Sequence, residues 1–432
     1  MGVLRVTNAL LLASAEAVPV ASAVLQAEDG AITYVGSELQ APPCPPEAEV
    51  LDAAGMLLMP GLVNAHTHAA MTLFRGVADD MPLKPWLEEK IWPMEGRLEP
   101  ADVYWGTLLG IAEMLRAGVT CYNDMYHYFA EGARAAVDAG IRAVLSGVLL
   151  GFLPNAADLL TEAVEFCLDL AGSGPSRVTP MLGPHAPYTC PDPLLRKVVA
   201  AAGEHGLGVH IHLAETAGEV ADSLRGHGTT PVRHMADLGM LELQVAAAHC
   251  VHLTDDDVAL AAQSGLGCCH CPSSNMKLAS GFARVPDLLA AGAVVGLGTD
   301  GAASNNNLDM IEEARMAALI HKGYRADPTA VTARQAFDMA TMGSARALGL
   351  ADRVGSLEVG KRADCVLVNL SGAHVQPLHD IVSQLVYATQ ASDVHTVIVD
   401  GEVLLCDRRF VRLDEEKVIA EASARSLRLA HP

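Results

Sequence analysis

The chain has 432 residues and a formal net charge of −22, and 51% of its residues are hydrophobic, 19% charged and 4% aromatic. This apolar content excludes a disordered chain, and the length allows one large barrel of about 250 residues with a small companion domain. The acidic excess argues against nucleic acid and anionic membranes as partners, and the scarcity of aromatic residues argues against a surface that stacks bases.

Residues 1–58 predict short strands joined by turns. The runs VLRVTNALLL and AVLQAEDGAITYVGSEL are apolar, and Glu28-Asp29-Gly30 inside the second is typical of a hairpin turn. The N-terminal segment is mildly similar to a secretory signal, but it has one early arginine and Glu16 interrupts it, so we interpret it as β-hairpin material. No stretch reaches about 18 uncharged apolar residues with membrane flanks, so no membrane span is expected.

From residue 59 to about residue 350, short apolar runs alternate with helical patterns. Eight runs predict strands: LLMPGLVNAHTH, VTCYNDM, IRAVLSGVLL, VTPMLGPH, LGVHIHLAE, VAAAHCV, GLGCCHCP and AVVGLGTD. The helical patterns between them include ADVYWGTLLGIAEMLRAG and PDPLLRKVVAAAGEHG, and both end at glycine, as helices often do. This alternation predicts an α/β fold in which residues 59–350 form a (β/α)8 TIM-like barrel.

Residues 351–432 return to strand patterns, in GSLEVGKRADCVLVNL and HTVIVDGEVLLCDRRFV. Since both ends of the chain show short apolar runs typical of strands, we predict a small β-sandwich domain built from residues 1–58 and 351–432. The ten cysteines have no disulfide-framework spacing, and several lie in apolar runs. We therefore expect buried free thiols and a reducing, cytoplasmic location.

Polar residues follow the predicted barrel strands where these strands end. They are His66-Thr67-His68, His185, His212 with Glu215, His249, and Thr299-Asp300. A barrel builds its active site at the C-terminal ends of its strands. Residues i and i+2 share a face of a strand, so His66 and His68 are expected to point together into the barrel mouth. Two ordinary turn histidines are the alternative, which the other polar strand ends make less attractive.

The fifth predicted strand offers two histidines on one face, His210 and His212, so periodicity alone does not choose a metal ligand. His212 lies closer to the mouth, and we take it as the ligand and His210 as a packed or hydrogen-bonded neighbour. Asp300 ends the eighth strand, where a buried aspartate needs a cation or hydrogen-bond donors to stay charged. Three neutral imidazoles and one carboxylate suit a borderline divalent ion, zinc first.

Several motifs together resemble the amidohydrolase superfamily over nearly the whole chain: PGLVNAHTH, GPHAPYT, HLAET, HCPSSNMKLASG, GTDGAASNNNLDM and GSLEVGKRADCVLV. FRGVADDMPLKPWLEEKIWPMEG and GTDGAASNNNLDM are more specific. They resemble the 5′-methylthioadenosine/S-adenosylhomocysteine deaminase branch and its near relatives, the chlorotriazine hydrolases and guanine deaminase-like enzymes. The resemblance implies a hydrolase that deaminates adenine nucleosides: 5′-methylthioadenosine, S-adenosylhomocysteine or adenosine.

The same resemblance implies one zinc ion per chain, bound by His66, His68, His212 and Asp300. Zinc lowers the pKa of a bound water to about 7, and the resulting hydroxide would attack C6 of the adenine ring. Asp300 would take the water proton and pass it toward the leaving amine, and Glu215 would protonate ring N1. His249 would hydrogen-bond the hydroxide and the developing oxyanion.

Four further residues would contact the nucleoside. Glu95 is similar to the family's acceptor of ribose hydroxyls, and His185 to its residue on the purine N3 side. Trp86 would wall the thioether end, and Ser304 would lie near the purine. Plainer interpretations stay open: an exposed helix-start carboxylate for Glu95, a turn histidine for His185 and a core position for Trp86. Residues 143–160 contain no lysine or arginine that could hold a homocysteine carboxylate, so methylthioadenosine ranks first.

Two local patterns are assigned no function. The match to G-x-G-x-x-G at residues 296–301 closes the strand series instead of opening a βαβ unit, so its glycines are interpreted as letting the backbone approach the metal pocket. The cluster at residues 268–271, three cysteines and a histidine, alternates between the faces of one strand and cannot close a tetrahedral site.

Two other functions compete with a nucleoside deaminase. One is hydrolysis or deamination of another aromatic ring, such as a chlorotriazine, guanine or a pterin; Glu95 argues against it, because such rings carry no vicinal diol. The other is a non-catalytic barrel that has lost its metal, which the complete ligand set opposes. The expected partner is a small purine nucleoside, and the sequence does not fix the oligomeric state, a homo-oligomer included.

Overall fold

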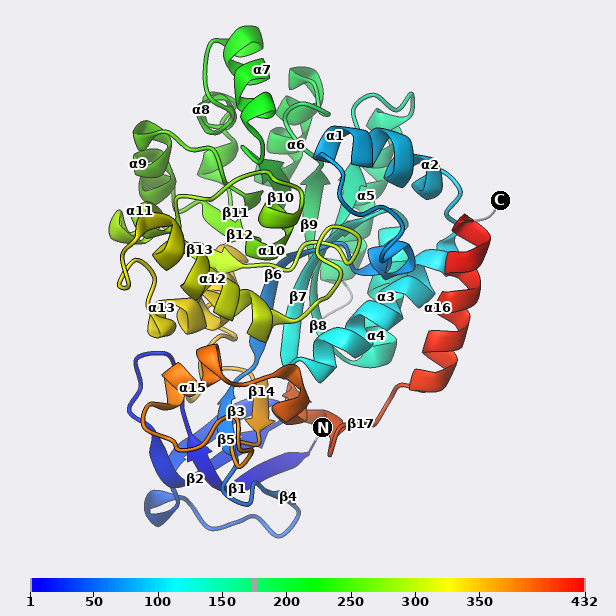
Figure 1. Cartoon of the computed structure of the whole chain (residues 1–432). Helices are drawn as coiled ribbons and strands as arrows, with labels where there is room; N and C mark the ends of the chain where they lie inside the picture. The colour runs from blue at the N-terminus through cyan, green and yellow to red at the C-terminus, as the bar shows by residue number, and fades with distance from the viewer. Residues whose placement is uncertain (1, 173–176, 431–432) are drawn as a thin grey trace.

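The computed structural model describes residues 2–172 and 177–430, which form a barrel of parallel strands and a separate sheet beneath it in the view of Figure 1. Within these residues the barrel sheet has eight strands, arranged in chain order. They are β6 (Leu62–Thr67), β7 (Val119–Tyr126), β8 (Arg142–Leu149), β9 (Val178–Pro184), β10 (Gly208–Leu213), β11 (Val245–His249), β12 (Gly267–His270) and β13 (Val295–Leu297). The predicted TIM-like barrel is confirmed.

The barrel registers bring the C-terminal strand ends to one rim. Neighbouring strands are parallel; on β10 and β11, for example, Leu213 lies opposite His249. Between β13 and β6 the rim closes where the N–H of Asp300 donates to the carbonyl of His66, 3.0 Å away. The polar strand ends therefore share one end of the barrel, where this architecture places active sites.

Helices connect the barrel strands and surround them (Figure 1). They are α3 (Pro100–Arg116), α4 (Phe129–Ala139), α5 (Ala156–Gly172), α6 (Asp192–His205), α7 (Ala217–His227), α8 (Pro231–Asp237), η4 (Met240–Glu242), α9 (Asp255–Ser264), α10 (Pro272–Lys277), α11 (Val285–Ala290), α12 (Met310–Arg325), α13 (Ala333–Asp338), η5 (Met339–Gly343) and α14 (Ser344–Ala347). A capping box of Thr254 and Asp257 begins α9, a feature that stabilises a helix start by about 1 kcal/mol. α6 ends at Gly206, whose φ of +65° favours glycine. Among the described helices, none is both long and apolar enough to cross a bilayer.

A long segment between β6 and α3 contributes one wall of the barrel mouth. It contains the short helical pieces η2 (Ala69–Phe74), α1 (Leu83–Pro85), η3 (Trp86–Ile91), which is π-helical, and α2 (Trp92–Glu95). Trp86, Ile91 and Met94 are buried in one apolar cluster with residues of η2. Burial of these side chains fixes an otherwise irregular segment over the rim.

The expected sheet built from both termini is confirmed, and it has nine strands among the described residues. The strands are β1 (Val3–Leu11), β2 (Val20–Glu28), β3 (Ala31–Ser37), β4 (Glu49–Asp52), β5 (Leu57–Pro60), β14 (Cys365–Val368), β15 (Val394–Val399), β16 (Glu402–Cys406) and β17 (Arg409–Phe410). η1 (Glu38–Gln40), α15 (Ile381–Tyr387) and η6 (Ala391–Asp393) accompany them. β5 pairs antiparallel with β14, placing Leu58 opposite Leu367, so the two halves of the chain meet in the centre of the sheet.

Ion pairs and helix packing join the C-terminal region to the barrel. The buried guanidinium of Arg142, at the start of β8, donates to both carboxylate oxygens of Asp364, at 2.7 and 2.9 Å. Removing one partner of such a buried pair costs about 3–5 kcal/mol. The last helix, α16 (Glu415–Ala430), drawn red in Figure 1, packs along α3, where Arg425 donates to Asp102 at 3.2 Å.

Candidate active site and metal centre

A cavity opens at the C-terminal end of the barrel strands, with about 630 Å³ of empty space when its open mouth is included. Its polar lining comes from strand ends and includes His68, His185, His212, Glu215, His249 and Asp300. Its apolar lining includes Leu83, Trp86, Leu87, Ile91, Trp92, Val148 and Leu150. A concave, largely apolar space with a few convergent polar groups is typical of a small-molecule site.

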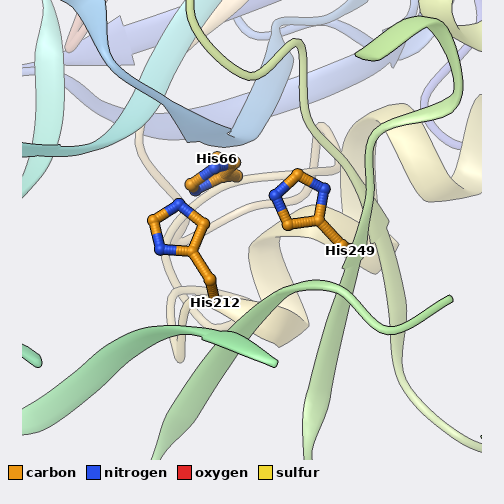
Figure 2. A group of neighbouring side chains, drawn as sticks. All are labelled: His66, His212 and His249. Carbon is orange, nitrogen blue, oxygen red and sulfur yellow. The ribbon is translucent and has the colours of Figure 1, made fainter. Parts of the chain in front are cut away.

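The structure brings the four predicted metal ligands together. The Nε2 atoms of His66 and His68 lie 3.5 and 3.4 Å from Oδ1 of Asp300. Nε2 of His68 lies 3.2 Å from Nε2 of His212. Figure 2 shows the rings of His66, His212 and His249 gathered around a common space, and one nitrogen of each lies within 4.8 Å of the others. Ligand atoms around a tetrahedral zinc ion are about 3.3–3.6 Å apart, so these separations suit a single ion.

Hydrogen bonds on the far side of two rings decide which nitrogen is free. Nδ1 of His68 lies 2.7 Å from the carbonyl oxygen of Met125, and Nδ1 of His212 lies 2.7 Å from the carbonyl oxygen of His185. A carbonyl only accepts, so each Nδ1 carries the hydrogen. Each Nε2 is therefore left with the lone pair that a metal ion needs.

His66 reaches the same state through a chain of hydrogen bonds. The hydroxyl of Ser146 donates to the carbonyl of Asp124 at 3.0 Å, so its oxygen accepts from Nδ1 of His210 at 3.1 Å. Nε2 of His210 then accepts from Nδ1 of His66 at 2.8 Å. Nε2 of His66 is left buried, with no hydrogen-bond partner among the described residues. Such an atom is costly unless a cation binds it, so this donor set fits a zinc ion.

The charges of the ligand groups agree with this assignment. Burial lowers the pKa of His66 to about 4 and that of His212 well below its ordinary value, so both rings are neutral at pH 7. Burial opposes the charge on Asp300, but the histidine rings that face it, that of His66 first, outweigh burial and hold the pKa of that carboxyl well below its usual range. The Ser274 hydroxyl and the Gly301 N–H also donate to Asp300, at 2.6 and 2.7 Å.

Backbone strain gathers at the same rim. Ala214, His249 and Asp300 follow or end barrel strands, and they have φ angles of +52°, +73° and +60°. Each such non-glycine conformation costs on the order of 1 kcal/mol and persists where the surrounding structure imposes it, often at functional sites. The strain therefore marks this rim independently of the side chains.

Glu215 and His249 lie beside the metal ligands. Oε2 of Glu215 is 3.8 Å from Nε2 of His249, whose Nδ1 lies 2.9 Å from Oδ1 of Asn275. The hydroxyl of Ser280 donates to Oε1 of Glu215 at 3.0 Å. Burial raises the pKa of Glu215 despite the attraction of His249. A carboxyl that keeps its proton closer to neutral pH is suited to donate that proton.

Glu219 supports Glu215 from behind, a role that the sequence analysis missed. Its two carboxylate oxygens accept hydrogen bonds of 2.8 Å from the N–H groups of Ala214 and Glu215. The pattern Thr216-x-x-Glu219 indicates a helix cap, and the Thr216 hydroxyl does accept from the Glu219 N–H at 3.1 Å. The Glu219 side chain instead reaches the strand end, which the capping pattern alone does not reveal.

Glu95 ends α2, the last helical piece of the irregular segment, and lines the cavity. Its carboxylate lies 3.7 Å from Nε2 of His127. Burial would raise the pKa of Glu95, but the attraction of the neighbouring His127, with a smaller effect of Tyr126, outweighs burial and lowers it. Glu95 is therefore an ionised acceptor facing the cavity. His127 had no distinguishing pattern in the sequence.

The other three predicted substrate residues differ in their positions. Trp86 lines the cavity and is also buried, with its indole N–H donating to the Ala78 carbonyl at 3.1 Å. His185 lines the cavity with its Nδ1 2.9 Å from the Thr189 hydroxyl oxygen. Ser304 is buried and donates to the Gly301 carbonyl at 3.0 Å. Among the described residues that line the cavity, Ser304 is not included.

The two dismissed sequence patterns have packing roles. A Cβ added to Gly298 would lie 2.8 Å from Cβ of His66, and one added to Gly301 would lie 2.9 Å from Sδ of Met71. The glycines thus let the β13 backbone approach the metal-ligand strand, as expected. In residues 2–172 and 177–430, the groups that place three metal-ligating atoms together contain no cysteine.

Comparison with known proteins adds three findings. The amidohydrolase family matches residues 57–404. A 5-methylthioadenosine/S-adenosylhomocysteine deaminase of Pelotomaculum thermopropionicum is 52% identical over 381 residues, 88% of each chain, and one of Moorella thermoacetica is 49% identical over 93% of this chain and 94% of the other. The crystal structure of an adenosine deaminase from Xanthomonas campestris with bound zinc superposes with a TM-score of 0.94 at 38% identity, covering 99% of this chain and 98% of that one.

Proposed function

This chain belongs to the amidohydrolase family, and we propose that it is a zinc-dependent hydrolase that deaminates adenine nucleosides, 5′-methylthioadenosine before S-adenosylhomocysteine and adenosine. The observation that carries the proposal is the convergence of three histidine Nε2 lone pairs and the Asp300 carboxylate beside Glu215. The relatives named as methylthioadenosine/S-adenosylhomocysteine deaminases, at about half identity, support this choice of substrate class.

The ligands of one zinc ion would be His66, His68, His212 and Asp300. A zinc ion in such a site lowers the pKa of water to about 7 and so supplies a nucleophile at neutral pH. Asp300, held by Ser274 and Gly301, would accept the water proton and return it to the departing amine. Overall, water adds its oxygen to C6, ammonia leaves, and the nucleoside becomes an inosine.

Two residues would act directly on the purine. Glu215, with its raised pKa, would donate a proton to ring N1 and make C6 electrophilic. His249 would donate a hydrogen bond from Nε2 to the oxygen that gains charge at C6, because its Nδ1 already faces Asn275. A neutral imidazole has only one N–H, and here Nδ1 uses it to donate to Asn275, so a hydrogen on Nε2 as well requires the positively charged ring. The neighbouring Glu215 and Asp300 favour that charge, and they raise the pKa of His249 against the effect of burial.

The substrate preference rests on the shape and charge of the cavity. Glu95 lines the cavity and would accept both ribose hydroxyls, which free bases and triazines lack. Among the described cavity-lining residues none is lysine or arginine, and Val148 and Leu150 contribute apolar surface there. Arg142, the nearest cation in sequence, is bound to Asp364 at the other end of β8. A methylthio group suits this wall, while an amino-acid carboxylate would lose hydration without gaining a partner.

The defining experiment measures ammonia release from adenosine, methylthioadenosine, S-adenosylhomocysteine, guanine and a chlorotriazine by the zinc-loaded protein. We expect turnover of the nucleosides, the highest kcat/KM for methylthioadenosine, and negligible turnover of the ribose-free rings. Turnover of a free base or triazine alone would replace the proposal with the competing ring-hydrolase function. Equal kcat/KM values for the two thioether nucleosides would reject the ranking but not the reaction.

The cysteines support a reducing location. All ten lie in the described residues and are free, and eight of them are buried. Because disulfides form in oxidising compartments, a chain with this many free thiols suits the cytoplasm.

A further inference from the structure

A second group of metal-ligating side chains lies outside the barrel, where α6, α7 and α8 meet. Asp192 is the first residue of α6, His227 is the last residue of α7, and His234 lies in α8. One ligand atom from each lies within 4.8 Å of the other two. We propose that these three residues bind an exchangeable divalent transition-metal ion, with zinc as its representative, in addition to the ion of the barrel.

The group shares one arrangement with the candidate centre in the barrel, although its Nε2–Oδ1 separation is that of a hydrogen bond and its rings lie closer together. Nε2 of His234 lies 2.9 Å from Oδ1 of Asp192, and the rings of His227 and His234 stack with centroids 3.8 Å apart and planes 23° apart. In the barrel, Nε2 of His68 lies 3.4 Å from the Asp300 carboxylate, and its ring stacks on His212 at 5.2 Å and 26°. In both places two nearly parallel imidazoles face one carboxylate.

The local fold holds the three side chains in place. α7 ends at Gly228, with a φ of +75°, and the chain turns at once into α8, whose first turn is capped by the Thr230 hydroxyl. That hydroxyl also donates to Asp257 at 2.6 Å, and the Ser223 hydroxyl donates to the Thr229 carbonyl at 2.8 Å. The turn therefore fixes the end of α7 against α8, so little conformational entropy would be lost when an ion binds.

The chemistry of the group favours a borderline cation. Neutral imidazole is the form of histidine that binds a metal ion. Two imidazole nitrogens and one carboxylate oxygen suit zinc, nickel or copper. The net charge of −22 raises the concentration of cations near the surface.

The site differs from the barrel centre in access and in ligand number. His227 is exposed, whereas His234 is buried, so an ion reaches the group directly from solvent. Three protein ligands leave at least one coordination position to water, and binding is expected to be weaker than in the four-ligand barrel centre. A bound ion would link α6 and α7 to α8, and it would raise the melting temperature, because it binds only the folded chain.

The test uses the protein loaded with one zinc ion per chain and dialysed against micromolar Zn²⁺. Elemental analysis should find a second equivalent in the wild type and in His205→Ala, an exposed histidine at the end of α6 that is not in the group. His227→Ala should hold one equivalent, keep wild-type deaminase activity and lose the rise in melting temperature on adding zinc. Because His234 is buried, Asp192→Asn is the second variant, and it should weaken the second equivalent at least tenfold.

Two results would overturn the inference. A wild type that never exceeds one zinc per chain has no such site. A second equivalent that His227→Ala and Asp192→Asn both retain with unchanged affinity is bound elsewhere. Both results concern zinc above the first equivalent, so they leave the proposed reaction untouched, and a failed deaminase assay would equally leave this site untouched.

Discussion

The carboxylate of Glu219 fixes the backbone of Glu215: Oε2 of Glu219 accepts the Glu215 N–H at 2.8 Å, while Oε1 accepts the Ala214 N–H at 2.8 Å. Ala214 has a φ of +52°, so the chain bends sharply just before Glu215. Two hydrogen bonds from adjacent amides hold this bend, and burial raises the pKa of the accepting Glu219 carboxyl to about 7. The position of the proposed proton donor therefore depends on a side chain that is not expected to touch the substrate.

The first prediction is that Glu219→Gln lowers kcat about tenfold or more, with little change in KM. An amide has one accepting end, so one backbone N–H would face an NH2 group, and losing a hydrogen bond to a charged group costs about 1.5–3 kcal/mol. Zinc content should stay at the wild-type level, because no ligand is altered. Steady-state kinetics and elemental analysis check this, with Glu204→Gln, an exposed glutamate in α6, as the control. Wild-type kcat in Glu219→Gln would mean that the bend holds Glu215 without this carboxylate.

The second prediction separates proton donor from ligand. Glu215→Gln should retain one zinc per chain but lose turnover by about 10²- to 10⁴-fold, since an amide cannot deliver a proton to N1. In the wild type, burial raises the pKa of the Glu215 carboxyl. Activity of the wild type should therefore fall as the pH rises above that pKa, because the donor loses its proton. Single-turnover rates across pH measure both effects. If the variant turned over at a near wild-type rate, Glu215 would be structural.

The third prediction concerns the hydrogen-bond chain behind His66. Chelation should remove the barrel zinc and abolish activity, and added zinc should restore it. Ser146→Ala removes the acceptor for His210, so His210 can change tautomer and His66 loses its fixed lone pair; such supporting contacts are typically worth about 10–100-fold in metal affinity. Competition with a chromophoric chelator measures this affinity, and Ser423→Ala, on the exposed surface of α16, is the control. Unchanged affinity in Ser146→Ala would show that the chain does not set the tautomer.

The sequence predicts those parts of the fold and of the site whose residues follow a repeating pattern of strands and helices. The barrel and the rim position of His66, His68 and Asp300 follow from strands that alternate with helices and end in polar residues. The two-residue period of a strand places His210 and His212 on the same face, but it does not tell which of them lies nearer the metal centre. In the structure, His212 lies 3.2 Å from His68, whereas His210 lies behind His66.

Other residues of the site, His127 and Glu219, do not follow the repeating pattern of strands and helices. His127 meets Glu95 only because the irregular segment before α3 crosses the barrel mouth, and its path follows from packing that no short pattern encodes. The role of Glu219 depends on the bend at Ala214, which no short sequence pattern encodes. The left-handed backbone conformations of Ala214, His249 and Asp300 could not be predicted from the sequence either, because these residue types, unlike glycine, rarely adopt them.

The fourth prediction is a pH dependence of stability that arises from Glu313. This carboxyl is fully buried; it accepts from the Ser273 N–H at 3.2 Å and the Asn305 amide at 2.9 Å, and burial raises its pKa to about 8. In the unfolded chain it titrates near about 4.3. Between these values the folded state keeps a proton that the unfolded state has lost, so this group's contribution to stability falls as the pH rises and levels off above about 8.

Glu313→Gln, which stays neutral at every pH, should flatten that decline, which is on the order of a few kcal/mol at most because each unit of pKa difference corresponds to about 1.4 kcal/mol. Urea unfolding at pH 5.5 and pH 8 measures it, with Glu312→Gln, its exposed neighbour, as the control. Equal slopes in wild type and Glu313→Gln would mean that the buried carboxyl is ionised throughout.

The fifth prediction concerns the ribose. Glu95 is held ionised by His127 and Tyr126 and faces the cavity, so we expect it to accept the two vicinal hydroxyls of the nucleoside. 2′-Deoxyadenosine leaves one acceptor position unpaired, at a cost of about 1–3 kcal/mol for a buried group, which corresponds to roughly 5- to 150-fold in kcat/KM. Glu95→Ala should lower kcat/KM for adenosine toward that for 2′-deoxyadenosine, so that the ratio approaches one, while zinc content stays unchanged. Glu89→Gln, an exposed carboxylate in η3, should keep the wild-type ratio. A ratio in Glu95→Ala as large as in the wild type would place the ribose elsewhere in the cavity, and it would remove the main argument that this site prefers nucleosides to free rings.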